Sequence, residues 1–249
     1  MEHNPFSLEG KTILVTGAAS GIGKSIALEC AYQGAKLVLL DMNEAKLTEV
    51  ISLMPTNGHL MYVVNLTNHQ QLSNAVEQFP KLDGIASNAG VVKSLVAQFS
   101  EKKDAEDIFN INSISHIDLI QTILSYKKLK KGASIVFTSS MSGVFCGAVG
   151  GALYGASKAA IYGYSKALAL ELSPKSIRVN TVNPGMIHTG IFDNTSISEE
   201  EFKEDMKHYP LKRYGRPEEV AYAVVYLLSD ATQWMTGTAL LIDGGYSVQ

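Results

Sequence analysis

Short apolar runs alternate with longer segments of helical pattern along the chain. The run from Leu37 to Leu40 is apolar at every position, as is typical of parallel strands covered on both faces. The strands that this pattern predicts span 11–16, 36–41, 60–65, 83–88, 133–139, 177–183 and 238–242. The helices predicted between them span 22–33, 43–53, 68–79, 101–130, 154–173 and 217–229.

This alternation predicts an α/β fold, namely a doubly wound, Rossmann-type parallel sheet of about seven strands with helices on both faces. A chain of 249 residues suits one large domain, and its composition shows neither an internal repeat nor a proline-, glycine- and serine-rich linker. We therefore predict a single domain over 1–249. The irregular stretch near 186–210 is expected to be a substrate loop, since loops of this length in compact domains usually bind ligands.

The composition narrows the class of protein. Hydrophobic residues make up 46% of the chain and charged residues 18%, which suits a buried core and argues against disorder. The net charge of −3 provides no overall field that would attract nucleic acid or an anionic membrane. We expect the basic run 127–131 to be a solvated helix end. The predicted partners therefore include neither nucleic acids nor membranes.

Cysteine usage and the first residues predict a cytoplasmic protein. Cys30 and Cys146 are too few for a disulfide framework, and no cysteine spacing suggests a metal site, so no metal is predicted. The first residues lack the charged and apolar regions of a signal peptide, and no apolar run is long enough to cross a bilayer.

Three glycines, Gly17, Gly21 and Gly23, lie between the first predicted strand and the first predicted helix. Glycine lets the backbone approach an anion closely, and the free N–H groups at a helix start point toward it, so the turn predicts a nucleotide site. The dinucleotide pattern G-x-G-x-x-G is not met. A P-loop would need glycine where the chain has Ala18. An ordinary turn between strand and helix is the alternative.

Tyr154 and Lys158 lie four residues apart at the start of a helical segment, so both project from one face. A free tyrosine has a pKa near ~10 and is a poor base at neutral pH. A nearby ammonium favours the phenolate, so Lys158 is expected to lower the pKa of Tyr154 and allow proton exchange with an alcohol or ketone. Two surface neighbours without function are the alternative.

Three serines lie at the end of the strand predicted over 133–139: Ser139 is its last residue, and Ser140 and Ser142 follow it. The carboxyl ends of parallel strands line the ligand crevice, where a serine could bond to a reacting oxygen. The residues alone do not choose among the three, and a solvated turn serine is the alternative.

Together these motifs resemble the short-chain dehydrogenase/reductase family. The family's glycine turn matches residues 16–23, and its Asn-Ala-Gly turn matches 88–90. Its Ser-Ser-x-x-Gly motif matches 139–143, and its Tyr-x-x-x-Lys motif matches 154–158. Its Pro-Gly segment matches 183–185, and its C-terminal signatures match 215–221 and 236–245. The resemblance covers residues 11–245. It departs from the family at Ser87, where an asparagine is usual, and at Asn65, where an aspartate is frequent.

The resemblance implies hydride transfer between a nicotinamide cofactor and a carbonyl/alcohol substrate. Tyr154 would exchange the proton, Ser140 would steady the substrate oxygen, and Lys158 would hold the cofactor ribose. Asn112 would anchor a water beside Lys158, with Asn110 as its rival for that role. The cofactor-binding residues that it implies are Gly17, Ser20, Gly21, Ile22, Gly23, Asp41, Asn65, Leu66, Asn88, Ala89, Gly90, Tyr154, Lys158, Pro184, Gly185, Ile187 and Thr189.

Asp41, at the end of the second predicted strand, favours NAD over NADP. Its carboxylate can accept hydrogen bonds from the ribose hydroxyls and would repel a 2′-phosphate. Ser20 stands where NADP enzymes of the family often carry a basic residue. NADP is not excluded, and a helix N-cap is the alternative role for Asp41.

Three alternatives to a general carbonyl reductase or alcohol dehydrogenase stay open. An NADPH-dependent 3-oxoacyl-acyl-carrier-protein reductase fits the overall pattern, with the basic run 127–131 meeting an acidic carrier protein. Asp41 disfavours it, as does Leu170, where such reductases commonly have an arginine. A non-catalytic nicotinamide sensor would not need the full set of catalytic residues, and a purely structural oligomer would not need the glycine turn. Apolar residues on more than one face of the helix 154–173 also predict a homotetramer.

Overall fold

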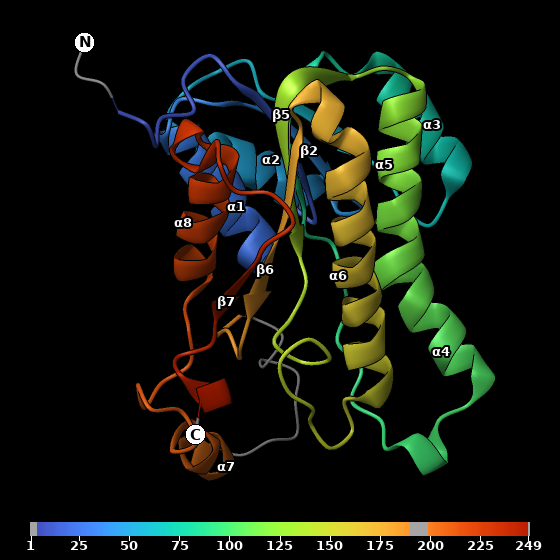
Figure 1. Ribbon diagram of the computed structural model, residues 1–249, viewed down its shortest axis with the longest axis vertical. Helices are drawn as coiled ribbons and strands as arrows, with labels where there is room; N and C mark the ends of the chain where they lie inside the picture. Colours follow the sequence, from blue (N-terminus) through green and yellow to red (C-terminus); the bar gives the residue numbers. More distant parts are fainter. Residues whose placement is uncertain (1–3, 190–198, 249) are drawn as a thin grey trace.

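The computed structural model of the chain describes residues 4–189 and 199–248. Its three layers are a central sheet and a layer of helices on each face (Figure 1). The strands are β1 (Thr12–Thr16), β2 (Lys36–Asp41), β3 (Leu60–Val63), β4 (Leu82–Ser87), β5 (Leu129–Thr138), β6 (Arg178–Pro184) and β7 (Ala239–Ile242). They are all parallel, in the order β3-β2-β1-β4-β5-β6-β7. The predicted doubly wound α/β fold is confirmed.

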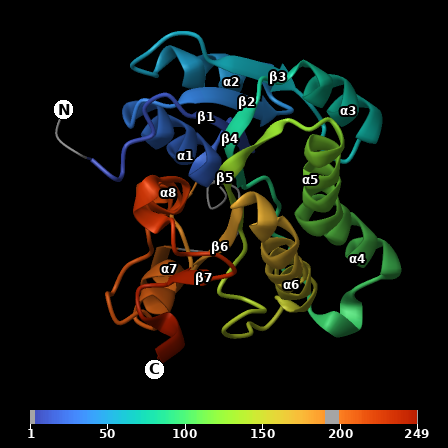
Figure 2. The ribbon, with the colours of Figure 1, turned by 45° about the horizontal axis from the view of Figure 1, so that its top comes forward.

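The helices flank the sheet because each central strand buries both of its faces. They are α1 (Gly21–Tyr32), α2 (Glu44–Ser52), α3 (His69–Gln78), α4 (Lys102–Phe109), α5 (Ser115–Ser125), α6 (Ala152–Leu172), α7 (Glu199–Met206) and α8 (Pro217–Leu228). In β1, Ile13 and Val15 join the core beneath α1, α2 and α8, whereas Leu14 joins the core beneath α3, α5 and α6. Figure 2 shows α1 and α8 on one side of the sheet and α5 and α6 on the other.

The helix predicted over 101–130 is confirmed from Lys102 to Ser125, but its predicted end at 130 is wrong. Helix α4 ends at Phe109, a π-helical segment spans Asn110–Ile114, and α5 ends at Ser125. Lys127 then takes a left-handed conformation with φ of 53°, which a helix does not allow, and β5 begins four residues earlier than predicted. The basic run 127–131 therefore forms a turn and the start of a strand instead of a helix end.

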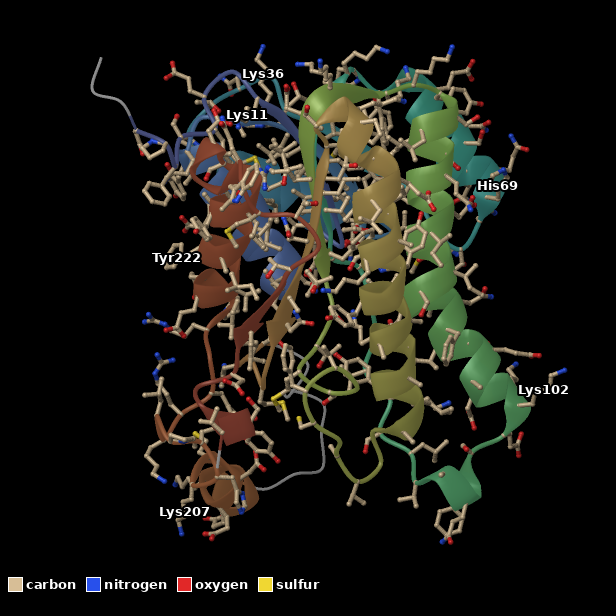
Figure 3. The ribbon with its side chains drawn as sticks, viewed as in Figure 1. Lys11, Lys36, His69, Lys102, Lys207 and Tyr222 are labelled. Carbon is tan, nitrogen blue, oxygen red and sulfur yellow. The ribbon has the colours of Figure 1, made fainter. Side chains whose placement is uncertain are left out.

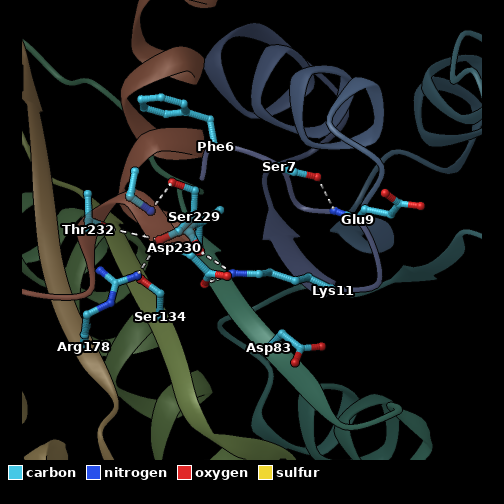
Figure 4. Close-up of polar contacts among 12 residues, drawn as sticks. Phe6, Ser7, Glu9, Lys11, Asp83, Ser134, Arg178, Ser229, Asp230 and Thr232 are labelled. Atoms are coloured by element: carbon cyan, nitrogen blue, oxygen red, sulfur yellow. Dashed lines mark hydrogen bonds and ion pairs between the residues drawn. The ribbon is translucent and has the colours of Figure 1, made fainter. Parts of the chain in front are cut away.

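A polar network closes the amino-terminal end of the sheet (Figure 4). The buried guanidinium of Arg178 donates to the carbonyl oxygens of Leu227 and Ser229, at 2.9 and 3.1 Å. Lys11 Nζ lies 2.6 Å from Asp230 Oδ1. The bonds from Arg178 satisfy two carbonyl oxygens at the end of α8. In a parallel sheet, it is the opposite, carboxyl end of the strands that receives a ligand.

The outer surface of the layers is polar in the way expected of a globular chain. Lys36, Lys102 and Lys207 are exposed and point away from the layers (Figure 3). Among the described residues, no helix combines the length and apolar character needed to cross a membrane, and no three His, Cys, Asp or Glu side chains group as metal ligands.

Candidate active site

The glycine turn after β1 is built so tightly that side chains have no room. Gly17 and Gly21 have φ of 65° and 51°, a conformation that favours glycine. A methyl group on Gly23 would overlap the carbonyl oxygen of Gly17. Ser20 is the N-cap of α1 but makes no side-chain capping bond, so its side chain leaves the first amides of the helix uncapped.

A second turn, Asn88–Gly90 after β4, packs directly against the glycine turn. Thr16 Oγ1 accepts hydrogen bonds from the backbone N–H groups of Asn88 and Ala89, at 2.9 and 3.1 Å. A methyl group on Gly17 would lie 2.9 Å from the Cα of Ala89. The neighbouring strands β1 and β4 therefore place the two predicted cofactor segments in contact.

Asp41 is oriented toward the glycine turn. Its Oδ2 accepts a hydrogen bond from the N–H of Ala19 at 3.1 Å, and its Oδ1 accepts from Asn43 at 3.0 Å. The N-cap of α2 is Asn43, whose side chain accepts from the N–H of Lys46. The alternative role of Asp41 as that N-cap is therefore wrong.

Tyr154 and Lys158 project from the first turns of α6, beside the end of β5. Ser140 lies beside the phenol of Tyr154, close enough for their interaction to lower the pKa of that phenol. Ser139 instead donates to the backbone carbonyl of Lys158 at 2.9 Å. The structure therefore selects Ser140 as the partner of Tyr154, a choice that the residue types alone leave open.

Burial controls the protonation of this pair. Desolvation raises the pKa of Tyr154, and the interaction with Ser140 reverses only part of that rise. Desolvation also lowers the pKa of Lys158 to about 8, while its Nζ donates to the carbonyl oxygen of Thr138 at 2.9 Å. Burial thus raises the pKa of Tyr154 in this structure, and a lowering of that pKa by Lys158 stays a prediction.

Asn112 lies in the π-helical segment and is fully buried, whereas its rival Asn110 is exposed. Its Oδ1 accepts from the N–H of Val91 at 2.8 Å, and its Nδ2 donates to the carbonyl of Val91 at 2.9 Å and to Ser157 Oγ at 3.1 Å. A methyl group on Gly90 would lie 3.1 Å from Asn112 Oδ1 and 3.2 Å from Lys158 Nζ. The anchoring of a water by Asn112 stays a prediction.

The segment after β6 forms the opposite side of the predicted cofactor site. Gly185 donates to the carbonyl of Ile242, and Ile187 pairs with Gly215 in an isolated bridge. Thr189 lies close to the glycine turn, since a methyl group on Gly21 would be 3.5 Å from its Cγ2. Residues 190–198 of the predicted substrate loop lie outside the described residues.

The comparison with known proteins decides the family. The family model described as Enoyl-(Acyl carrier protein) reductase matches residues 17–247. The 3-oxoacyl-[acyl-carrier-protein] reductase of Thermotoga maritima is 34% identical over 244 residues, which cover 96% of this chain and 98% of that protein. The Dehydrogenase/reductase SDR family member 6 of Rattus norvegicus is 34% identical over 97% of this chain and 99% of its own length. The chain belongs to the short-chain dehydrogenase/reductase family.

Solved structures agree with this assignment. A short-chain dehydrogenase/reductase from Serratia marcescens superposes with a TM-score of 0.88, at 29% identity over 98% of this chain and all of that one. A short-chain type dehydrogenase/reductase from Mycobacterium marinum gives the same TM-score, at 31% identity over 98% of each chain. The protein is therefore an oxidoreductase that acts on a carbonyl/alcohol pair with a nicotinamide cofactor.

Two polar positions of this short-chain dehydrogenase differ from the motif that the sequence matched. Asn65 is exposed, and its Oδ1 accepts from the N–H and the hydroxyl of Thr67, at 3.0 and 2.9 Å. The oxygen of Ser87 lies 2.6 Å from Nδ1 of His116, a buried residue that the sequence motifs did not indicate. The serine at position 87, where the family usually has an asparagine, was a signal in the sequence that this position has a different hydrogen-bond partner. Only the fold shows that the partner is His116 of α5.

Proposed function

We propose that Tyr154, Ser140, Lys158 and Asn112 carry the proton chemistry of this oxidoreductase. The observation that supports it best is the convergence of Ser140 and the buried Lys158 on the Tyr154 end of α6. Tyr154 would donate its proton to the carbonyl oxygen during reduction and remove the hydroxyl proton during oxidation. Ser140 would bond to the same oxygen and hold it beside the phenol.

The residues present fit a nicotinamide dinucleotide. The tight turn at Gly17–Gly23 provides a backbone cradle that a methyl group on Gly23 would fill, and the start of α1 favours a pyrophosphate. When bound, the cofactor supplies the two-electron redox step. The chain's own residues would position it: Asp41 and Lys158 at the two riboses, and the segment 184–189 with the turn 88–90 along its length.

The carboxylate of Asp41 supports NAD as the cofactor. It is already held by Ala19 N–H, next to the position that a 2′-phosphate would need. The second candidate function is reduction of a 3-oxoacyl group carried by an acyl carrier protein, because 3-oxoacyl-[acyl-carrier-protein] reductases are among the relatives. Against it, Leu170 is 77% exposed on α6 and offers no charge to a carrier. The basic run 127–131 lies at the amino-terminal end of β5, and Ser140 follows the opposite, carboxyl end of that strand.

An uncharged substrate with an apolar group fits the entrance of this site. Val92, Phe145 and Val149 are exposed on the loops that follow β4 and β5. The nearby charged side chains are paired, Lys93 with Asp104 and Arg213 with Glu219.

The homotetramer and the cytoplasmic location also remain proposals. Helix α6 buries Ile161, Leu168 and Leu172 against the sheet, while Ala160, Gly163, Ala167 and Leu170 form a second, exposed stripe. Its spacing of three and four residues suits contact with another helix, and two-fold contacts of this kind build dimers and tetramers.

The test of the proton carrier is Tyr154→Phe. We expect turnover to fall at least ~1,000-fold, since general acid–base catalysis contributes up to about 10⁴-fold and the bond to the substrate oxygen is also lost. Binding of NADH, followed by its fluorescence, should stay within about twofold. The substrate for the assay comes from a panel of uncharged ketones, 2-oxo acids and a 3-oxoacyl thioester, read at the nicotinamide absorbance. Comparable turnover in the variant would overturn the mechanism.

A further inference from the structure

The Asn88–Gly90 turn is held from another side by His116, the second residue of α5. Nε2 of His116 lies 2.7 Å from the carbonyl oxygen of Ala89, and Nδ1 lies 2.6 Å from Oγ of Ser87. The ring is almost completely buried, with 1% of the residue exposed. His116 thus bridges the last residue of β4 and the turn that follows it.

The partners of the ring decide which nitrogen carries the proton. A backbone carbonyl oxygen can only accept, so Nε2 must be protonated and donate to Ala89. Burial, and then the nearby charge of Lys158, lower the pKa of His116 to about 3, although the bond to Ala89 opposes this. The ring is therefore neutral at ordinary pH, and Nδ1 accepts a hydrogen bond from the hydroxyl group of Ser87.

This bond completes the fixation of the Ala89 peptide. The N–H of Ala89 donates to Thr16 Oγ1 at the end of β1, while its carbonyl accepts from His116 in α5. The next residue, Gly90, lies so close to Asn112 Oδ1 and Lys158 Nζ that a methyl group there would be 3.1 and 3.2 Å from them, tighter than most side-chain contacts. A rotation of this peptide would thus disturb the glycine turn on one side and the catalytic amine on the other.

We infer that His116, supported by Ser87, is a positioning residue that keeps the Asn88–Gly90 turn ordered between the glycine turn and Lys158. The inference rests on the proposed function, since this turn affects catalysis only if the cofactor lies against it. The motifs matched in the sequence do not supply it, because Ser87 departs from them and His116 lies outside them. A histidine that merely filled the core would stabilise the fold and leave the turn unaffected.

Three variants separate positioning from core filling. His116→Leu keeps most of the volume and removes both hydrogen bonds, whereas His116→Gln retains an N–H donor and an oxygen acceptor. Thr122→Val is the matched control, since Thr122 is also buried in α5 and makes no recorded contact with the turn. For each variant, the dissociation constant of NADH is measured by fluorescence, and amide hydrogen exchange of residues 89–91 is measured in the protein without ligand.

We expect His116→Leu to weaken NADH binding about tenfold and to accelerate exchange at residues 89–91 by a similar factor, because the turn loses the buried hydrogen bond to the Ala89 carbonyl. His116→Gln should restore both values to within about threefold of the unmodified protein. Thr122→Val should change neither, even if it lowers the melting temperature. If His116→Leu does not fold, Ser87→Ala should show the same two changes at smaller size.

A spectrum of the protein labelled with ¹⁵N-histidine tests the ring directly. Nε2 should carry the proton, and His116 should not titrate between pH 5 and 8. A folded His116→Leu protein with unchanged NADH binding and unchanged exchange would overturn the inference, as would a proton on Nδ1. Tyr154→Phe separates this outcome from the failure of the proposed function: turnover in that variant would refute the mechanism, while the exchange data would still decide the role of His116.

Discussion

At the scale of single residues, the loss of solvent on burial is the main cause of the pKa shifts of Tyr154 and Lys158. The phenol is stabilised in its protonated form, and the buried ammonium is destabilised, so the two side chains do not share charge as a simple ion pair. This leaves Tyr154 loaded with a proton at neutral pH. The resting arrangement therefore favours donation to a carbonyl over removal of a proton from an alcohol.

The raised pKa of Tyr154 predicts opposite pH profiles for the two directions of the reaction. Alcohol oxidation needs the phenolate, so its rate should rise with pH up to at least about 10, near the ordinary pKa of tyrosine. Ketone reduction needs the phenol and should fall only above that range. Initial rates in both directions at constant ionic strength would check this, and an oxidation rate that levels off below pH 8 would contradict it.

The position of Asp41 predicts a preference for NADH over NADPH. Replacement by alanine in Asp41→Ala removes the repulsion of the 2′-phosphate and the acceptor for the ribose hydroxyls. We expect NADPH binding to strengthen and NADH binding to weaken, each by about tenfold, a change of ~1.4 kcal/mol. Asp118→Ala on α5 is a control of equal charge change. Tighter binding of NADPH by the unmodified protein would refute the preference.

Some residues of the candidate site could be predicted from the sequence only as one of two neighbours, and one could not be predicted at all. Ser140 and Asn112 each had a neighbouring rival of the same type, and only burial and orientation separate them from Ser139 and Asn110. His116 could not have been found, because its partners come from β4 and the turn after it, nearly thirty residues away in the chain.

At the scale of elements, the glycine turn and the first strand were predicted because their signals are local. The alternation of apolar runs likewise predicted the order of strands and helices. The π-helical segment within the helix over 102–125 was missed, because the apolar pattern is continuous there and the segment depends on tertiary contacts of Asn112 and Ser113. The start of β5 depends on pairing of Leu129 with Leu82, a contact that no local pattern reveals.

The packing of the glycine turn predicts a severe effect for Gly23→Ala. The added methyl group would overlap the carbonyl oxygen of Gly17, so the turn must move away from the start of α1. We expect NADH binding to weaken at least ~100-fold and the free energy of unfolding to fall by about 1–3 kcal/mol. Gly132→Ala is the control, since its methyl group meets no atom within 4 Å although its φ of 78° adds some strain. Equal NADH affinity in both variants would contradict this prediction.

At the scale of the whole molecule, the exposed stripe of α6 predicts self-association. Among the described residues, no atom outside the backbone of α6 lies within 4 Å of a methyl group built on Gly163, so a partner helix could approach closely there. We expect Ala167→Glu to place a charge in that contact and to convert the assembly into smaller species, as measured by light scattering at micromolar concentration. Lys175→Glu, outside the stripe, should leave the mass unchanged. A one-chain mass for the unmodified protein would refute the tetramer.

The contact between the glycine turn and the Asn88–Gly90 turn also has a consequence for how the molecule acquires its binding site. The two segments are about seventy residues apart in the chain, and they meet only after β1 and β4 have paired at the centre of the sheet. Such distant contacts form late, so partly folded chains would lack the site altogether. A ligand that binds only the native state stabilises it by about 2.7 kcal/mol at a hundred times its dissociation constant. The supply of cofactor in the cell would then influence how much of this chain survives proteolysis, apart from any catalytic turnover.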